Sequence, residues 1–206
     1  MRFGGEHLIY GIGHSSNKYP ATVNGVKTKE YEAWYGLLKR CRSEKYLSRE
    51  PTYDGCLVSN EWLYYDNFYN WIVSQDNYDK WKHGSHWGID KDILIKGNKI
   101  YSDQTCLLVP QNINELFTNR RLHRGDYPIG VDYLKKLDKF RASCMNPFTK
   151  KQEHIGVYCT SEDAFIAYKT YKENIIQKVA EDEYQKGNIT VQCYNAMLNY
   201  QIEIND

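Results

Sequence analysis

Two carboxylates that flank a lysine are the residues of this chain best suited to chemistry. Asp90, Lys91 and Asp92 lie in the segment 88–94, whose other residues are glycine or apolar. Apolar residues around a short polar group are typical of a strand. Carboxylate oxygens are the ligands that a hard divalent cation such as Mg²⁺ prefers. The segment therefore predicts a strand whose acidic pair is suited to a cation.

The residues that follow predict the elements needed to complete a site. A polar Gly-Asn loop stands at 97–98, and an apolar segment at 105–110 predicts a second strand. Pro110 favours the start of a short helix, because proline is tolerated in the first helical turn. Asn114 falls about one turn into this helix. The order predicted is strand, strand and helix.

This order resembles the HNH endonuclease family of phages, also called ββα-metal or His-Me finger nucleases. The resemblance covers residues 88–121 and implies metal ligation by Asp90 and Asn114, with Mg²⁺ or Mn²⁺ as the cation. Lys91 stands where the family has its general-base histidine, and Thr105 stands where it has its central asparagine. Other residues match the family's segment around the second strand: Tyr101, Ser102 and Cys106.

The lysine changes the chemistry that the resemblance implies. A lysine ammonium has no free electron pair with which to take a proton from water near pH 7. Asp92 is one alternative base, and His83 or His86 in the preceding loop are others. A metal can also lower the pKa of its own bound water. Lys91 would then clamp a phosphate, and the remaining alternative is a nuclease finger kept only to bind DNA.

Composition limits these interpretations. The chain has 206 residues and a net charge of +1, which excludes a globally basic nucleic-acid binder. The charge is uneven, however: residues 117–155 hold nine Lys/Arg against four Asp/Glu, and 173–206 hold two against six. A local basic face is compatible with phosphate contact by one part of the chain.

The part before residue 88 predicts helices and loops. Six glycine and proline residues make 1–27 an irregular arm. Thr28 can cap a helix that continues to about Ser43, with aromatic and apolar residues at helical spacing. A second short helix is expected at 66–74, and the polar, aromatic residues 75–87 are expected to form a loop.

The part after residue 124 predicts a small sheet and one long helix. Alternating segments at 128–133, 139–144 and 153–158 indicate three strands. Thr160 and Asp163 then have the spacing of a capping box at the start of a helix.

This second part resembles the ethylene-response-factor type of DNA-binding domain, whose three-stranded sheet enters the major groove with a helix behind it. The matching residues are Gly130, Val131, Phe140, Arg141, Ala142, Ile155, Gly156, Val157, Tyr158, Thr160, Glu162, Ala164, Ala167 and Tyr168. The resemblance places Tyr133, Lys139 and Arg141 on the DNA face, and cations on alternate strand positions can reach phosphates or guanine edges. The basic stretch before the sheet adds candidate DNA contacts: Arg120, Arg121 and Arg124. The alternative is a solvated edge strand that lysines protect from aggregation.

Cysteine usage predicts a reducing compartment. The six cysteines follow no signal-peptide pattern and form no Cys-x-x-Cys pair. Buried, unreactive thiols explain this spacing better than a structural zinc held by Cys41, Cys56 and Cys106. No segment approaches the roughly 20 apolar residues of a membrane span, and Gly11-Ile12-Gly13 lacks the lysine of a phosphate loop, so no nucleotide cofactor is expected.

The sequence therefore predicts an α+β protein: N-terminal helices with a ββα-metal finger, then a three-stranded antiparallel sheet packed on one long helix. The expected divisions are 1–27, 28–123 and 124–206, the last with a C-terminal helical tail. The expected function is that of a phage-encoded, homing-type endonuclease, which cuts double-stranded DNA in the host cytoplasm. The alternative is a catalytically inactive DNA-binding regulator, or an inhibitor of a host nucleic-acid enzyme on the same scaffold.

Overall fold

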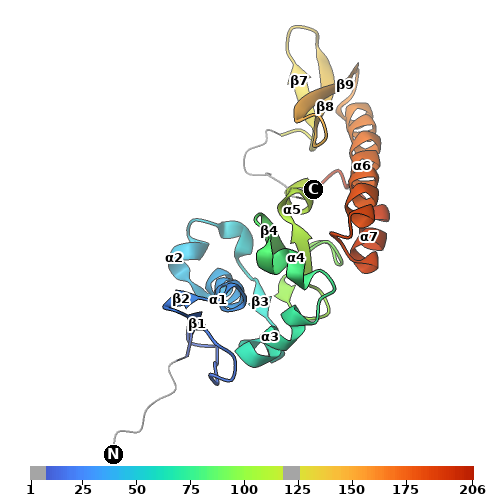
Figure 1. Cartoon of the computed structure of the whole chain (residues 1–206). Coiled ribbons are helices and arrows are strands. Elements are labelled where there is room, and N and C mark those ends of the chain that lie inside the picture. Colours follow the sequence, from blue (N-terminus) through green and yellow to red (C-terminus); the bar gives the residue numbers. More distant parts are fainter. Residues whose placement is uncertain (1–7, 118–125) are drawn as a thin grey trace, which may run out of the picture. The chain divides into compact units, whose positions relative to one another are not determined.

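The chain folds into two compact units, residues 1–109 and 110–206 (Figure 1). The computed structural model describes residues 8–117 and 126–206. Helices and β-sheet occur in both ranges, which confirms the predicted α+β class. The division falls between Val109 and Pro110, whereas the sequence predicts it after residue 123.

The first unit is built around α1 (Lys29–Arg42). The Thr28 hydroxyl caps this helix by accepting the backbone N–H of Tyr31 at 3.3 Å. Trp34 and its neighbours on one face are fully buried against α3 (Tyr65–Val73), so both predicted helices are confirmed. Shorter helices connect them: α2 (Glu44–Leu47), η1 (Pro51–Tyr53) and η2 (Glu61–Leu63).

The N-terminal segment is more regular than its glycine content predicts. Strands β1 (Thr22–Val23) and β2 (Val26–Lys27) form an antiparallel hairpin. Asn24 and Gly25 join them with φ angles of 51° and 79°, as a two-residue turn between right-twisted strands requires. The prediction of an irregular arm missed this Asn-Gly turn.

Residues 75–87, expected to form a loop, contain α4 (Tyr78–His83). A helix of this length is not stable by itself. Glu30 of α1 supports it: this carboxylate is only 2% exposed, accepts the Tyr78 hydroxyl and binds the Lys82 ammonium at 2.6 Å. Burial would raise the pKa of Glu30, but these hydrogen bonds outweigh it and lower the pKa. The loop prediction was wrong because these partners lie about 50 residues away in the sequence.

The predicted order of strand, strand and helix is present. Strand β4 (Trp87–Asp90) pairs with β6 (Leu107–Pro110), which leads into α5 (Gln111–Leu116). Between them, β5 (Ile100–Tyr101) pairs in parallel with β3 (Leu57–Val58). The first strand is shorter than the predicted segment 88–94, since it ends at Asp90.

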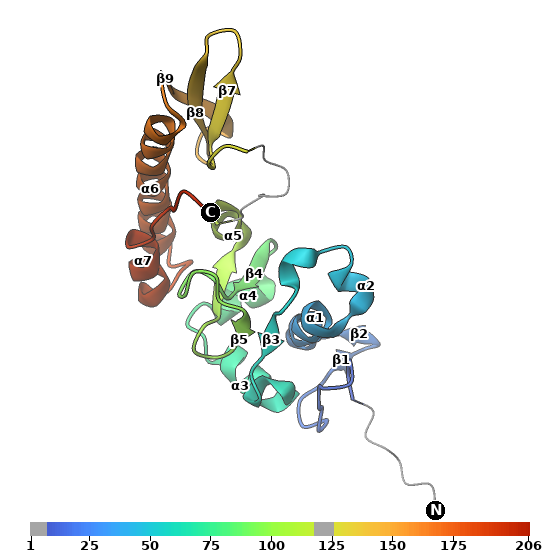
Figure 2. The same cartoon turned by 180° about the vertical axis from the view of Figure 1, so that it is seen from behind.

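The second unit contains the predicted sheet and long helix (Figure 2). Strands β7 (Val131–Leu134), β8 (Lys139–Asn146) and β9 (Lys151–Tyr158) pair antiparallel in that order. They pack on α6 (Ser161–Gln185), whose cap Thr160 accepts the Asp163 N–H at 3.1 Å as predicted. Helix α7 (Val191–Leu198) packs on α6.

Gly130 fixes how the sheet meets α6. Its φ angle is 76°, and a Cβ atom added there would lie 2.0 Å from a ring carbon of Tyr168. We expect Gly130→Ala to lower the free energy of unfolding by about 2–4 kcal/mol through backbone strain and overpacking, measured by urea denaturation. Gly97→Ala is the control, because Gly97 has a φ of 74° but open space around it. Equal losses in the two variants would contradict the packing argument.

Candidate functional site

Asp90 ends β4 by folding the chain back on its own side chain. Its Oδ1 accepts the backbone N–H of Asp92 at 2.7 Å and of Ile93 at 2.8 Å. Aspartate often forms such local turns, which compete with strand pairing. The turn explains why the strand stops before Asp92 and Ile93.

The same carboxylate has the properties of a cation ligand. Asp90 is only 8% exposed, and burial raises its pKa although the two backbone hydrogen bonds act in the opposite direction. Within the described residues its Oδ2 accepts no hydrogen bond. A carboxylate oxygen without a donor, on a residue that is otherwise buried, fits a hard divalent cation, whose charge would stabilise the ionised form.

Lys91 points into the protein and holds the loop that follows. Its ammonium binds Asp92 Oδ2 at 2.6 Å and the carbonyl oxygen of Asn98 at 2.7 Å, and the residue is 8% exposed. The Asn98 side-chain amide donates back to the Lys91 carbonyl at 2.9 Å. These contacts close the loop 91–98, so Lys91 has a structural task that the phosphate-clamp interpretation did not include.

We expect Lys91→Met to lower the free energy of unfolding by about 1–3 kcal/mol, because the Asn98 carbonyl and the Asp92 carboxylate lose a charged donor. Methionine keeps the volume of the aliphatic chain, and Lys91→Arg is the control that keeps the donors. Urea denaturation would measure both. A Lys91→Met protein as stable as the wild type would show that the ammonium does not hold the loop.

Asn98 is a site residue that the sequence analysis did not single out. Besides its bond to Lys91, its amide donates to the Ile100 carbonyl at 2.7 Å, and its Oδ1 accepts the Ile100 N–H at 3.0 Å. Thr105 also contacts this segment, since its hydroxyl donates to the Ile100 carbonyl at 2.8 Å. The Gly97-Asn98 pair predicted a turn, but nothing in the sequence indicated that the amide braces both of its ends.

Asn114, the second predicted ligand, lies in α5 and therefore in the second unit. Asp90 belongs to the first unit, so the pairing of these two residues stays a prediction.

The histidines proposed as alternative bases lie at the surface, before β4 in the chain. His83 is the last residue of α4, and both it and His86 are exposed. The four residues from His86 to Asp90 run along the extended β4, which separates their Cα atoms by on the order of 13 Å. Asp92, with 43% of its side chain exposed, is the candidate base nearest to Asp90 in the sequence.

The outer face of the sheet carries two of the predicted DNA contacts. Arg141 pairs across the strands with Asp132 and Val157, and its guanidinium binds Asp132 at 2.8 Å. Lys139 lies two residues earlier on β8 and therefore faces the same side. All four of these side chains are exposed, whereas the neighbouring Ala142 is buried towards α6.

Tyr133 does not share that face, contrary to the prediction. The register pairs Tyr133 with Phe140. Phe140 is next to Arg141 on β8, and neighbouring residues of a strand point to opposite faces of the sheet. Its hydroxyl donates to Asp138 at 2.6 Å, next to the β7–β8 turn. Arg120, Arg121 and Arg124 lie outside the described residues.

Four of the six cysteines are buried. Burial raises the pKa of Cys41 and of Cys106 to about 12, and all six thiols are free.

In the described ranges no three His, Cys, Asp or Glu side chains form a metal-binding group. No helix there has the length and apolar character to cross a membrane.

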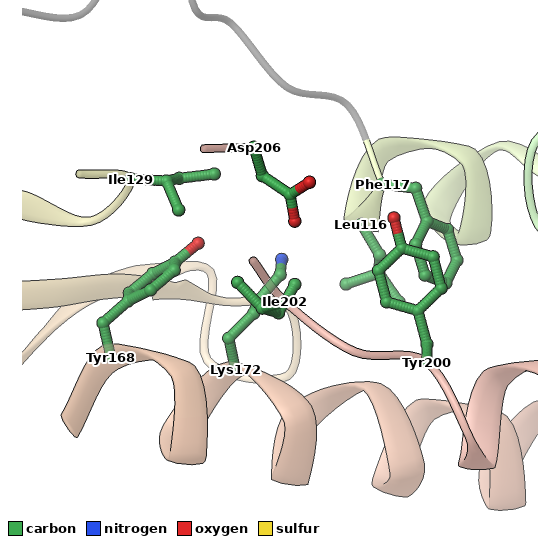
Figure 3. Close-up of a pocket in the computed structure, with 8 residues that line it drawn as sticks. All are labelled: Leu116, Phe117, Ile129, Tyr168, Lys172, Tyr200, Ile202 and Asp206. Carbon is green, nitrogen blue, oxygen red and sulfur yellow. The ribbon is translucent and has the colours of Figure 1, made fainter. Parts of the chain in front are cut away.

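A small cavity in the second unit is lined by α6 and the C-terminal segment (Figure 3). Its volume is about 70 Å³, far below the roughly 300 Å³ at which small-molecule sites begin. Figure 3 shows the Lys172 side chain rising from α6 between Tyr168 and Ile202. Burial lowers the pKa of Lys172. The cavity is too small for a nucleotide or a substrate.

Comparison with protein-family models, with curated proteins and with solved structures gives no match.

Proposed function

We propose that this protein binds double-stranded DNA and hydrolyses its phosphodiester bonds at a divalent cation, in the manner of an HNH endonuclease. The observation that carries the proposal is Asp90, a buried carboxylate at the end of β4 with one oxygen fixed by the turn and the other without a donor. The order β4, β6, α5 with Asn114 in the helix supports it.

Asp90 would hold the cation, Mg²⁺ or Mn²⁺, and the family resemblance implies Asn114 as a second ligand. The bound cation would polarise the phosphate and acidify a water molecule. Oδ1 of Asp90 stays on the backbone N–H groups, which orients Oδ2 as the ligand. Asp92 would accept the proton of the attacking water, while Lys91 keeps that carboxylate in place through their 2.6 Å ion pair.

The sheet of the second unit would provide the DNA contact. Lys139 and Arg141 lie on its exposed face, where cations can reach phosphates and base edges. Asp132 reduces this positive potential, because it binds the Arg141 guanidinium at 2.8 Å. We assign positioning on DNA to this face and cleavage to Asp90.

The second candidate function is that of a DNA-binding regulator that does not cut. It is favoured by the direction of Lys91, whose ammonium is used inside the loop 91–98, and by the exposed positions of His83 and His86. Both candidate functions share DNA binding and differ only in cleavage.

Incubation of the purified protein with supercoiled plasmid and Mg²⁺ or Mn²⁺ tests both. We expect nicked or linear product with either cation and none in EDTA. Retardation of linear duplex without product would support the regulator, and the absence of both cleavage and retardation would overturn the proposal.

A further inference from the structure

The first unit contains a groove between α1, α4 and β4. Lys29, Glu32, Gly36 and Arg40 line it from α1, and Trp81 and Trp87 line it from the other side, so the groove holds two cations and one carboxylate. Its volume is about 240 Å³, slightly below the roughly 300 Å³ at which enclosed small-molecule sites begin. This size suits one part of a longer chain better than a whole small ligand.

Both cations of the groove are held by neutral groups, although the Glu32 carboxylate lines the same groove. The Lys29 ammonium donates to three carbonyl oxygens, those of Trp81, Lys82 (3.5 Å) and Gly84 (2.8 Å), and lies 4.9 Å from the Trp81 ring centroid. The Arg40 guanidinium lies 5.8 Å from the Tyr53 ring centroid. Across residues 8–117 and 126–206, neither cation forms an ion pair with a carboxylate. Charges that are partly buried without a counter-ion favour an anionic ligand.

The spacing of these cations matches a nucleic-acid strand. Lys29 and Arg40 are eleven residues apart on one helix, which is about 16 Å along its axis. A DNA strand carries one phosphate per roughly 3.4 Å of duplex axis, so a strand along α1 passes several phosphates between the two. Trp87 is half-buried and presents an indole beside this path, and such rings stack on bases and sugars.

We propose that this groove binds one strand of the DNA substrate, with phosphates against Lys29 and Arg40 and a sugar or base against Trp87. The inference rests on the proposed function, since it takes DNA as the ligand. Trp87 and Ile89 of β4 line the groove, and the next residue is Asp90. A strand held there therefore passes the end of β4, where the candidate cation site begins.

The first test removes one charge at a time from α1. Arg40→Gln should weaken the binding of a fluorescent DNA duplex and lower the slope of log K against log salt by about 0.9, the value for one phosphate contact. Lys39→Gln is the matched control, because Lys39 is exposed on the same helix and does not line the groove. It should change the slope much less. Fluorescence anisotropy over a series of salt concentrations measures both.

The second test fills the groove. A Cβ atom on Gly36 meets nothing within 4 Å, so a larger side chain fits there without displacing the fold. Gly36→Glu and Gly36→Gln add side chains of the same size, but only glutamate adds a charge that repels phosphate. We expect Gly36→Glu to bind at least about threefold more weakly than Gly36→Gln at low salt, with a smaller difference as salt screens the charge.

The outcomes separate this inference from the proposed function. Unchanged affinity and slope for both Arg40→Gln and Gly36→Glu would overturn the groove, while weaker binding by Arg141→Ala would leave DNA binding by the sheet intact. No DNA binding by the wild type would overturn both. Circular dichroism identifies a variant that fails to fold. If Arg40→Gln does not fold, the Gly36 pair decides.

Discussion

Asp90→Asn should lose plasmid cleavage and keep DNA binding. Asparagine retains an Oδ1 that can accept the N–H groups of Asp92 and Ile93, so the turn persists. It removes the negative charge that a divalent cation needs. Loss of several kcal/mol of metal-assisted stabilisation corresponds to a rate about 100- to 1,000-fold lower. Single-turnover cleavage with saturating protein measures this effect.

Asp90→Ala is less informative by itself because it also disturbs folding. Comparing it with Asp90→Asn separates the effect on cleavage from the effect on stability. Alanine leaves two backbone N–H groups without their acceptor, which costs about 1–3 kcal/mol for each one that water does not reach. We expect a clearly lower stability for Asp90→Ala and a stability within about 1 kcal/mol of the wild type for Asp90→Asn. Full cleavage by Asp90→Asn would remove this carboxylate from the mechanism.

The double variant Lys139→Ala, Arg141→Ala should weaken DNA binding about tenfold or more. The two contacts together should lower the slope of log K against log salt by about 1.8. Cleavage at saturating protein should change little, because these residues lie in the second unit and Asp90 lies in the first. Binding that is unchanged at every salt concentration would contradict the assignment of the sheet face to DNA.

Asp132→Asn should change DNA affinity in the opposite direction, at the same face of the sheet. It removes the carboxylate that binds Arg141 at 2.8 Å, and so frees the guanidinium for a phosphate. We expect tighter binding and a steeper salt dependence. Glu181→Gln on α6 is the matched control for a lost negative charge, since Glu181 is exposed and hydrogen-bonds Tyr194 instead of a sheet residue. Tighter binding in both variants would indicate general electrostatics instead of a defined contact.

Local signals in the sequence were sufficient for much of the fold. Thr28 and Thr160 each had a helix-capping residue type before an apolar periodic segment, and both helices begin where these caps predict. The three strands of the second unit followed from alternation alone. Such features depend on residues a few positions apart, which is why sequence spacing predicts them.

Other features depended on partners far along the chain, and only the tertiary structure decided them. Helix α4 exists because Glu30 and Lys29 of α1 bind its side chains and its terminal carbonyls. Tyr133 and Arg141 were both expected on the DNA face, but the register of β7 against β8 puts them on opposite faces. One residue of register moves a side chain to the other side of a sheet, and alternation within one strand carries no information about its neighbour.

The candidate site also has features that the sequence determines and features that only the tertiary structure determines. Residue types at 90–92 and 114 determined by themselves that a carboxylate, a lysine and an amide are available for cation and phosphate chemistry. The structure decided their states: Asp90 is buried with one oxygen in a turn, and the Lys91 ammonium is used by Asn98 and Asp92. Burial and hydrogen-bond partners determine whether a charged group can act on a ligand. The turn at Asp90 joins residues two and three positions apart, whereas the contact of Lys91 with Asn98 depends on how the loop 91–98 folds back.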